Sequence, residues 1–404
     1  MQYISRELAG VLERALLNMP VVVVTGMRQV GKSTMLRHDP ALSSRRYMSL
    51  DDYATMRSLQ ESPDAVLSGA EAVTIDEAQR IKDLFLAVKR AVDKKREASR
   101  FLLSGSANPA LLKGVSESLA GRAIYFELPP MSRREISGSA KEPPFLLEFT
   151  KSQKTPKRRE ASVINDREVL AGGLPPVALG EVGEARIWFT GYEQTYLERD
   201  LRDIAMVENI LGFRDLLKLT ALRTGQLLNI AGLARDAQLE PKTAARYLGW
   251  MEATYIVRRI HPFLRNKASR IKKSPKVYIS DSGLACHLTE CDDLSADTLR
   301  GPLYETYVLQ NLISIVEKNI PPGRIYYWQT QQGREVDFVI EIGKDIIALE
   351  VKSGETWSKR DLAGLSSFLA ATPRCKAAII AYNGGETAQL GERLWAIPLS
   401  TLLS

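Results

Sequence analysis

The stretch from Val21 to Thr34 constrains the fold of this chain more than any other segment. Four consecutive valines and a threonine have the composition of a strand that is buried on both faces of a parallel sheet. Two glycines then precede a lysine and a serine at the spacing of a phosphate-binding loop: Gly26-Met-Arg-Gln-Val-Gly31-Lys32-Ser33. A loop of this kind between a strand and a helix predicts an α/β domain that binds a nucleotide.

Each residue type in the loop has a task in nucleotide binding. Gly26 and Gly31 let the backbone turn and point its N–H groups at phosphate oxygens. Lys32 reaches the β- and γ-phosphates, the hydroxyl of Ser33 is a ligand for Mg²⁺, and Thr34 completes the nucleotide-binding set. An ordinary glycine turn is the alternative, but such a turn needs neither the lysine nor the serine. The loop therefore predicts ATP and Mg²⁺ as ligands.

A second apolar strand, residues 72–75, ends in two acids, Asp76 and Glu77. In nucleoside-triphosphatases such a strand lies beside the loop strand, where the first acid holds Mg²⁺ through water and the second polarises the attacking water. We assign these roles to Asp76 and Glu77, and so expect ATP hydrolysis. The alternative is a pair of acids that caps a helix at the end of a strand.

Two further residues are candidates in the same region. Strand 101–104 leads to Ser106, whose hydroxyl is placed to sense the γ-phosphate; a plain turn is the alternative. Arg122 follows the run Ser-Leu-Ala-Gly and can reach the nucleotide of a neighbouring copy, which would make the protein a homo-oligomer. A surface arginine at the start of a strand is the alternative reading of Arg122.

Length and composition limit the remaining possibilities. A chain of 404 residues is too long for one ordinary domain. The net charge of +7 weakly favours a polyanionic partner, and three cysteines and three histidines without zinc-site spacing fit a reducing compartment. No apolar run reaches about 18 residues and no leader pattern is present. We expect a cytoplasmic protein without membrane contact.

The first two regions follow from the pattern of strands and breaks. Strands alternate with helices over residues 1–138, which predicts a parallel sheet. Residues 139–165 contain a proline pair and a basic run over 151–159, and predict a linker or mobile insertion. Such charge runs are usually solvated, with DNA contact as the alternative.

The middle region, residues 166–265, is expected to be helical with a break at Gly-Gly-Leu-Pro-Pro. Residues 228–248 predict a helix-turn-helix, and strand 255–260 follows it like the wing of a winged helix. Basic residues then gather between Arg265 and Lys276 and suit phosphate contacts. Winged helices also serve as packing modules, so duplex contact and packing both stay open.

A second set of chemical residues lies near the C-terminus. Asp337 begins one strand, and Glu350 and Lys352 fall on one face of the next, because alternate residues of a strand point the same way. A turn at Gly343 joins these strands, and Glu305 on the preceding helix is a further ligand or acceptor. Asp337 and Glu350 suit Mg²⁺, and Lys352 can orient water or neutralise phosphate charge. The alternative is a Glu–Lys pair on a solvated sheet face.

The ordered series of motifs resembles a family of prokaryotic AAA-type ATP-binding proteins with an uncharacterised C-terminal domain. The matching stretches include Ile-Asp-Glu-Ala-Gln, Gly-Gly-Leu-Pro, Lys-Val-Tyr-Ile-Ser-Asp-Ser-Gly-Leu and Arg-Glu-Val-Asp-Phe. The resemblance implies an α/β fold with a P-loop ATPase domain, a helical and winged-helix middle, and a restriction-endonuclease-like (PD-(D/E)xK) domain over residues 266–404. On that resemblance Asp337, Glu350 and Lys352 fall on the nuclease motif, and Glu305 on its first helix.

Two functions remain open at this point. The first is an ATPase that couples nucleotide state to a DNA-directed, nuclease-like C-terminal module. The second is an ATP-switched DNA-binding or partner-docking regulator in which the nuclease-like domain is not catalytic.

Overall fold

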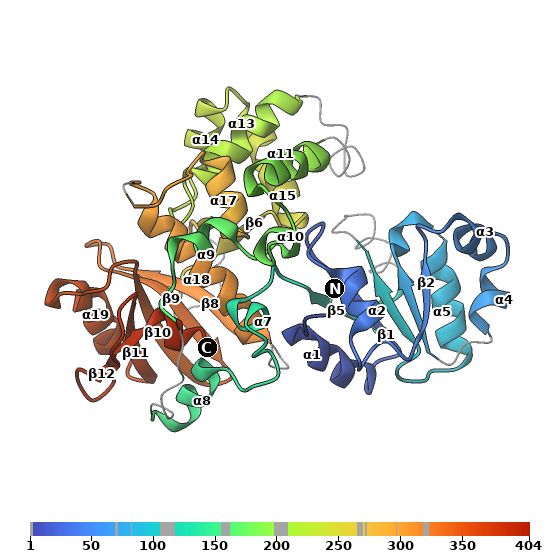
Figure 1. Cartoon of the computed structure of the whole chain (residues 1–404), viewed down its shortest axis with the longest axis horizontal. Coiled ribbons are helices and arrows are strands. Elements are labelled where there is room, and N and C mark those ends of the chain that lie inside the picture. The colour runs from blue at the N-terminus through green and yellow to red at the C-terminus, as the bar shows by residue number, and fades with distance from the viewer. Residues whose placement is uncertain are drawn as a thin grey trace. The chain divides into compact units, whose positions relative to one another are not determined.

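The computed structural model describes residues 3–68, 72–81, 83–105, 118–154, 162–197, 209–264, 270, 273–295, 297–317 and 323–404. They belong to two units, each with its own core (Figure 1). The first unit comprises Met1–Pro129 together with Gln194–Glu208 and Ala253–Tyr255. The second comprises Pro130–Glu193, Asn209–Glu252 and Ile256–Ser404.

A parallel sheet forms the centre of the first unit. Its strands are β1 (Val21–Thr25), β2 (Arg46–Ser49), β3 (Val73–Asp76), β4 (Phe101–Ser104) and β5 (Ala123–Glu127). They lie in the order β2-β3-β4-β1-β5, and every neighbouring pair is parallel. The predicted parallel sheet is therefore confirmed.

The order of the strands differs from the prediction in one respect. β4 lies between β1 and β3, so the strand that ends in the two acids is not the neighbour of the loop strand. Phe101 of β4 pairs with Val21 on one side and with Val73 on the other. All residues of β4 are buried, as expected for a strand with neighbours on both sides. The predicted adjacency is wrong, but both strands still end at the same edge of the sheet.

Helices pack on this sheet because each has an apolar face at helical spacing. The unit contains α1 (Glu7–Leu16), α2 (Lys32–His38), α3 (Tyr53–Glu61), α4 (Pro63–Ser68), the short turn η1 (Ala78–Arg80) and α5 (Leu84–Lys94). Leu59, Leu67 and Val88 of α3, α4 and α5 join one core with Val21 and Val23. The alternate valines of β1 face the other side of the sheet. The predicted helix over 109–119 falls largely outside the described residues.

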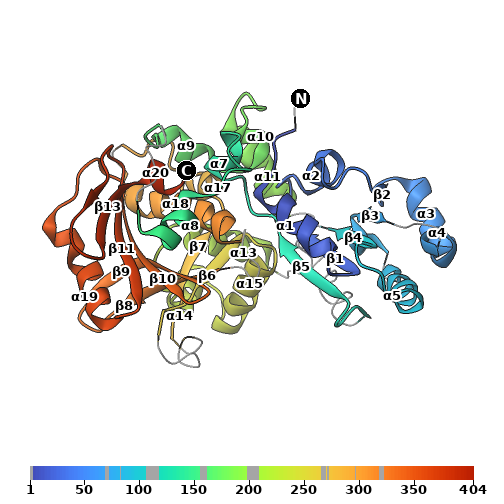
Figure 2. The same cartoon turned by 90° about the horizontal axis from the view of Figure 1, so that it is seen from below.

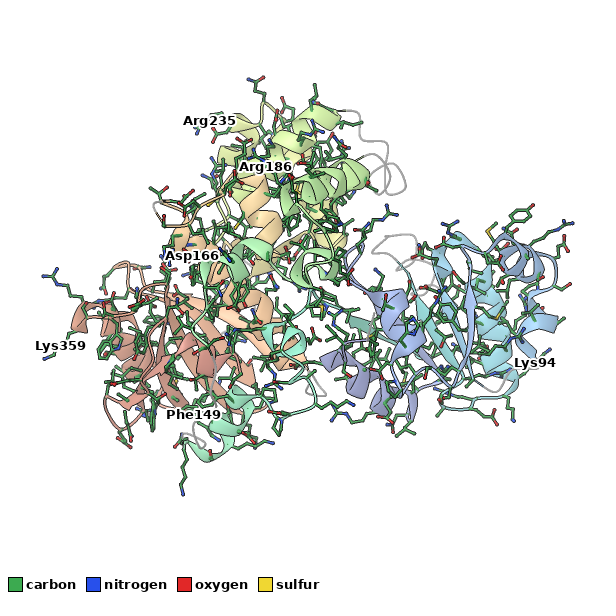
Figure 3. All side chains as sticks on the ribbon, in the orientation of Figure 1. Lys94, Phe149, Asp166, Arg186, Arg235 and Lys359 are labelled. Atoms are coloured by element: carbon green, nitrogen blue, oxygen red, sulfur yellow. The ribbon has the colours of Figure 1, made fainter. Side chains whose placement is uncertain are left out.

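The expected linker is partly helical. The sequence predicts irregular structure over 139–165, but α8 (Phe145–Ser152) forms within it, and the prediction is wrong there. The two phenylalanine rings of α8 stack at 5.6 Å, and Phe149 meets Trp395 edge-on at 5.3 Å. Figure 3 labels Phe149. Burial of these rings stabilises the segment by a few kcal/mol each. Residues 155–159 of the basic run lie outside the described residues.

Short helices make up most of the next part of the second unit. They are α7 (Arg133–Ile136), α9 (Asp166–Ala171), α10 (Pro175–Ala178), α11 (Ala185–Thr195), α13 (Ile210–Ala221), α14 (Ile230–Asp236) and α15 (Pro241–Ala253). The chain breaks between α9 and α10 at Gly172 and Gly173, as predicted. α14, α15 and the strand β6 (Val257–Ile260) follow one another as the helix-turn-helix pattern predicts.

β6 pairs with a strand from beyond the expected domain boundary at residue 265. Its antiparallel partner is β7 (Lys276–Ile279), and Ile260 lies opposite Lys276. The helix α17 (Ser282–Leu288) follows β7. The described residues on both sides of the expected boundary therefore belong to one unit.

A mixed sheet completes the second unit (Figure 2). Its elements are α18 (Arg300–Glu317), β8 (Arg324–Gln329), β9 (Glu335–Ile342), β10 (Asp345–Lys352), η3 (Lys359–Leu362), α19 (Ala363–Ala371), β11 (Cys375–Tyr382), β12 (Ala388–Gln389), β13 (Leu394–Pro398) and α20 (Leu399–Leu402). The strand order is β12-β13-β11-β10-β9-β8. β9 and β10 form an antiparallel hairpin with Gly343 in its turn, as predicted.

Candidate functional site

The loop after β1 has backbone geometry that requires glycine at two positions. Gly26 has a φ of +146°, and a Cβ atom there would lie 2.4 Å from the carbonyl oxygen of Leu128. Gly31 has a φ of 92° and immediately precedes α2. Both conformations are strained for residues with a side chain. The two glycines of the motif are therefore needed for the shape of the loop itself.

Lys32 lies across the inside of this loop. Its Nζ donates hydrogen bonds to the carbonyl oxygens of Met27 at 2.8 Å and of Gly26 at 3.1 Å, and the residue is 6% exposed. Ser33 is half-buried and Thr34 is exposed on the first turn of α2. An ammonium group held inside a turn of main chain suits the charge of phosphate oxygens.

One residue that supports the loop was missed by the sequence analysis. Arg6, just before α1, is 5% exposed, and its guanidinium donates to the carbonyl oxygens of Val30 at 2.7 Å and of Pro129 at 2.6 Å. Val30 belongs to the loop and Pro129 follows β5. No local pattern identifies Arg6, because an arginine at the start of an amphipathic helix is usually exposed.

Asp76 is buried at the end of β3 and is held by hydroxyl groups from both neighbouring strands. The hydroxyl of Tyr47 on β2 donates to one carboxylate oxygen at 2.5 Å, and that of Ser104 on β4 donates to the other. Burial and the bond to Asp76 raise the pKa of Tyr47. Glu77 follows with a φ of 59°, and its carboxylate accepts a hydrogen bond from Gln79 at 2.5 Å. The sequence did not predict the contacts of Tyr47 and Ser104 with Asp76 either, because these contacts depend on the order of the strands in the sheet.

Of the remaining two candidates of the first unit, only Arg122 belongs to the described residues, and it is not at the loop. Ser106 lies outside the described residues. Arg122 precedes β5, whose first residue Ala123 pairs with Val21 at the start of β1. Arg122 therefore lies at the edge of the sheet opposite the loop, roughly 16 Å away along β1. Its Nε donates to Asp93 at 2.7 Å.

In the second unit two of the C-terminal candidates, Glu305 and Asp337, contact a buried lysine. Lys276 of β7 has an exposed side-chain fraction of only 5%, and its Nζ lies 3.3 Å from Glu305 Oε1 and 3.9 Å from Asp337 Oδ1. It also forms an ion pair with Glu335. We call Glu305, Glu335, Asp337 and Glu350 the carboxylate cluster. The sequence analysis named Lys276 only as a phosphate-binding candidate, and its burial makes that prediction wrong.

Arg270 was expected to contact phosphate for the same reason, and it too is buried. Its Nε donates to the carbonyl oxygen of Leu264 at 2.7 Å, and its guanidinium lies over the rings of Phe263 and Tyr326. It serves as a packing residue inside the second unit. Arg265, Lys267 and Lys272 lie outside the described residues.

Local structure places Asp337 and Glu305 in the carboxylate cluster. The β9–β10 ladder runs as far as the pair Phe338–Leu349, and beyond it the carboxylate of Asp337 accepts the backbone N–H of Val351 at 2.8 Å. The hydroxyl of Tyr278, on β7, donates to Glu305. Burial raises the pKa values of both carboxyl groups, and the Asp337 charge adds to the shift at Glu305.

Glu350 and Lys352 lie on the same face of β10, as predicted. Lys352 Nζ contacts Glu350 Oε1 at 3.1 Å and, nearer to solvent, Asp361 Oδ1 at 3.4 Å. The other oxygen of Glu350, Oε2, is buried and has no hydrogen-bond partner among the described residues. Burial and the nearby charge of Asp337 raise the pKa of Glu350. This oxygen has an unfilled capacity to accept a donor or a cation.

The donor set fits Mg²⁺ better than a softer metal. Among the residues that the structure describes, no group of three or more His, Cys, Asp or Glu side chains is arranged to hold a metal ion by itself. Asp337 and Glu350 nevertheless offer carboxylate oxygens, including the unpartnered Oε2, and Mg²⁺ is typically bound by one or two carboxylates with waters and substrate phosphate. In the first unit, Ser33 and Asp76 offer the same kind of oxygen donors.

Exposed basic side chains lie on α14 and α15. Arg235 of α14 has a side-chain exposure of 81% and lies at the surface of this region (Figure 3). Lys242 and Arg246 are exposed on α15, and the guanidinium of Arg246 lies over the ring of Trp250 at 5.3 Å. Arg235 is paired with Asp236 at 3.2 Å, so the basic groups of α14 and α15 without a carboxylate partner among the described residues are Lys242 and Arg246.

The parallel sheet, the glycine loop after β1 and the acidic end of β3 together define an α/β fold of the P-loop ATPase type. Residues 18–137 match the family model of an AAA domain. Residues 165–295 and 300–402 match two domains of unknown function, DUF8612 and DUF4143. The first unit is thus an AAA-type nucleotide-binding domain.

The chain is similar over nearly its whole length to uncharacterized proteins of Mycobacterium tuberculosis and Mycobacterium bovis. Each is 33% identical over 404 residues, which is 99% of this chain and 84% of the relative. The chain belongs to the family of these proteins.

Solved structures resemble it more distantly. A Walker-type ATPase of Pyrococcus abyssi has a TM-score of 0.43 and 16% identity over 70% of this chain and 94% of that chain. The RuvB Holliday junction branch migration motor of Thermotoga maritima has a TM-score of 0.30 and 18% identity over 63% of this chain and 90% of that chain. In the part of the chain that the structure describes, none of the helices has the length and apolar character needed to cross a membrane.

Proposed function

We propose that the first unit is a Mg²⁺-dependent ATPase. The observation that carries this proposal is the inward position of Lys32 in a glycine loop at the same sheet edge as the buried Asp76. Lys32 binds the β- and γ-phosphates, Ser33 and Asp76 hold the metal, and Glu77 accepts the proton of the attacking water. Mg²⁺, when bound, neutralises phosphate charge and draws electron density from the bond that breaks.

Substitution of Glu77 tests this assignment. Glu77→Gln keeps the size and hydrogen-bonding capacity of the side chain but removes the proton acceptor, so it should bind ATP normally and lose most turnover. Glu61→Gln, an exposed carboxylate on α3 that pairs with Arg57, is the matched control and should behave like the wild type. Phosphate release and nucleotide affinity are measured on the same preparations. Wild-type turnover in Glu77→Gln removes Glu77 from the mechanism.

For the second unit we propose a DNA-directed, nuclease-like module whose state depends on the nucleotide. Asp337 and Glu350 would hold one Mg²⁺, and Glu305 is an acceptor behind them. Lys352, half-exposed at 31%, is placed between Glu350 and solvent, where it can orient a water molecule or neutralise charge on a phosphate. The exposed basic residues of α14 and α15 support a role in binding the phosphate backbone.

A cleavage assay tests the nuclease half of the proposal. Purified protein with Mg²⁺ or Mn²⁺ should cut DNA, in a manner that changes with ATP, and Asp337→Ala or Lys352→Ala should stop the cutting. Lys359→Ala, at an exposed position after β10, is the control (Figure 3). Cutting that survives both active-site substitutions would point to a contaminant or to another site.

The second candidate is an ATP-switched regulator that binds DNA or a protein partner without cutting. It is favoured by the ion pairs of Lys276, which already neutralise part of the carboxylate cluster. Salt-dependent DNA binding without cleavage in any divalent metal supports this candidate. Arg235→Ala and Arg246→Ala should then weaken binding and reduce its salt dependence, because each removes a cation from the exposed surface.

A further inference from the structure

The buried lysine of β7 neutralises one side of the carboxylate cluster. Lys276 contacts Glu305 at 3.3 Å, pairs with Glu335 and approaches Asp337 at 3.9 Å. Residue 276 is 4% exposed, so its ammonium group has little access to water or to a nucleic acid. Ion pairs with three carboxylates therefore hold the Lys276 ammonium group inside the cluster.

The other ammonium group of the cluster lies on its solvent side. Lys352 contacts Glu350 at 3.1 Å and Asp361 at 3.4 Å, and its side chain is 31% exposed. The cluster therefore has a buried cation on the Glu305 side and a half-exposed cation on the Glu350 side.

The two sides of the cluster are unequally satisfied. Glu305 Oε1 accepts hydrogen bonds from both Lys276 and Tyr278, whereas Glu350 Oε2 is buried without a partner among the described residues. A metal at the Glu350 side gains an available oxygen. A metal at the Glu305 side must first displace an ammonium group and compete with a hydroxyl.

We propose that Lys276 is a built-in cation that takes the place of a second metal ion, so that the carboxylate cluster binds a single divalent cation between Asp337 and Glu350. Lys276 is a positioning residue in this proposal, because it touches Glu305, Glu335 and Asp337 and not the substrate. The proposal rests on the metal site of the proposed function. It adds the number of metal ions that this site binds and the reason for that number.

The test counts bound metal directly. Full-length protein without nucleotide is titrated with Mn²⁺, and free Mn²⁺ is measured by electron paramagnetic resonance. Wild-type protein should bind one Mn²⁺ per chain with the background of Asp337→Ala subtracted, since that variant keeps any weak binding by the first unit. Glu350→Gln should lose the bound ion. Lys276→Met should bind a second Mn²⁺, because removal of the ammonium group leaves Glu305 and Glu335 uncompensated.

Several outcomes separate this inference from the function on which it rests. Two Mn²⁺ ions in the wild type, or one ion in both wild type and Lys276→Met, would overturn the role of Lys276 and leave the metal site intact. No binding by either protein would overturn the metal site as well. Lys276→Gln, which keeps a hydrogen-bond donor but not the charge, provides a second variant if the methionine variant does not fold. The wild-type count tests the proposal without any substitution of Lys276.

Discussion

Arg6 contacts the nucleotide loop from outside it, so substitution of Arg6 tests how much these contacts stabilise the first unit. Its guanidinium donates two buried hydrogen bonds, to Val30 and to Pro129. A hydrogen bond from a charged donor contributes about 1.5–3 kcal/mol, and a buried acceptor left without a partner costs a similar amount. Arg6→Ala should therefore destabilise the unit by roughly 3 kcal/mol or more, because water can reach the freed carbonyl groups only in part.

Calorimetry and nucleotide binding measure the two consequences. For a unit of this size, that loss of stability lowers the unfolding temperature by about 6–12 °C. ATP affinity should fall about tenfold, a free-energy change of about 1.4 kcal/mol, because Val30 is part of the loop. Arg6→Lys, whose single ammonium group reaches one carbonyl more easily than two, should lie between Arg6→Ala and the wild type.

Arg14→Ala is the matched control, since Arg14 is exposed on α1, the helix that follows Arg6. It should unfold close to the wild type and bind ATP with unchanged affinity. If Arg6→Ala and Arg14→Ala gave the same unfolding temperature and the same affinity, the two carbonyl contacts would have no energetic role, and the argument from burial would be refuted.

Three further predictions concern the same unit. Gly26→Ala should abolish ATP binding, because its Cβ would lie 2.4 Å from a carbonyl oxygen; wild-type affinity in a binding titration would contradict this. Tyr47→Phe should lower ATP turnover about tenfold with little change in nucleotide affinity, since it removes a hydrogen bond to Asp76 and no contact with the loop. Unchanged turnover would show that this bond does not position Asp76. If Arg122 acts on a neighbouring copy, Arg122→Ala and Lys32→Ala should each be inactive but regain turnover when mixed. A mixture that stays inactive, or an active Arg122→Ala, would leave Arg122 as a partner of Asp93 alone.

Local patterns predicted the elements that carry most of the chemistry. The glycine loop, the acidic end of β3 and the β9–β10 hairpin each depend on residues close together in the sequence, such as Gly343 between two alternating strands. Helix and strand periodicity also located β4 without error. The position of β4 between β1 and β3 was not predictable in the same way, because it depends on pairings between segments about 80 and 30 residues apart.

The missed residues depend on contacts between distant segments. Lys276 meets Glu305, Glu335 and Asp337, which come from two other elements of the fold. In the sequence Lys276 is the last of six basic residues that begin at Arg265, and nothing in the local pattern distinguishes it from the other five. The helix α8 was not predicted for a related reason. A proline pair and a basic run dominate the composition of this segment, whereas the partner of Phe149, Trp395, lies far along the chain.

The pairing of β6 with β7 has a mechanical consequence for the second unit. The strand β6 begins a few residues after α15, and its four residues are paired one by one with β7, from Val257–Ile279 to Ile260–Lys276. The two paired strands span roughly 13 Å, and Lys276 lies at the end of the pair opposite to Val257, where β6 begins after α15. A displacement of β6 is therefore transmitted through main-chain hydrogen bonds to the strand that carries Lys276.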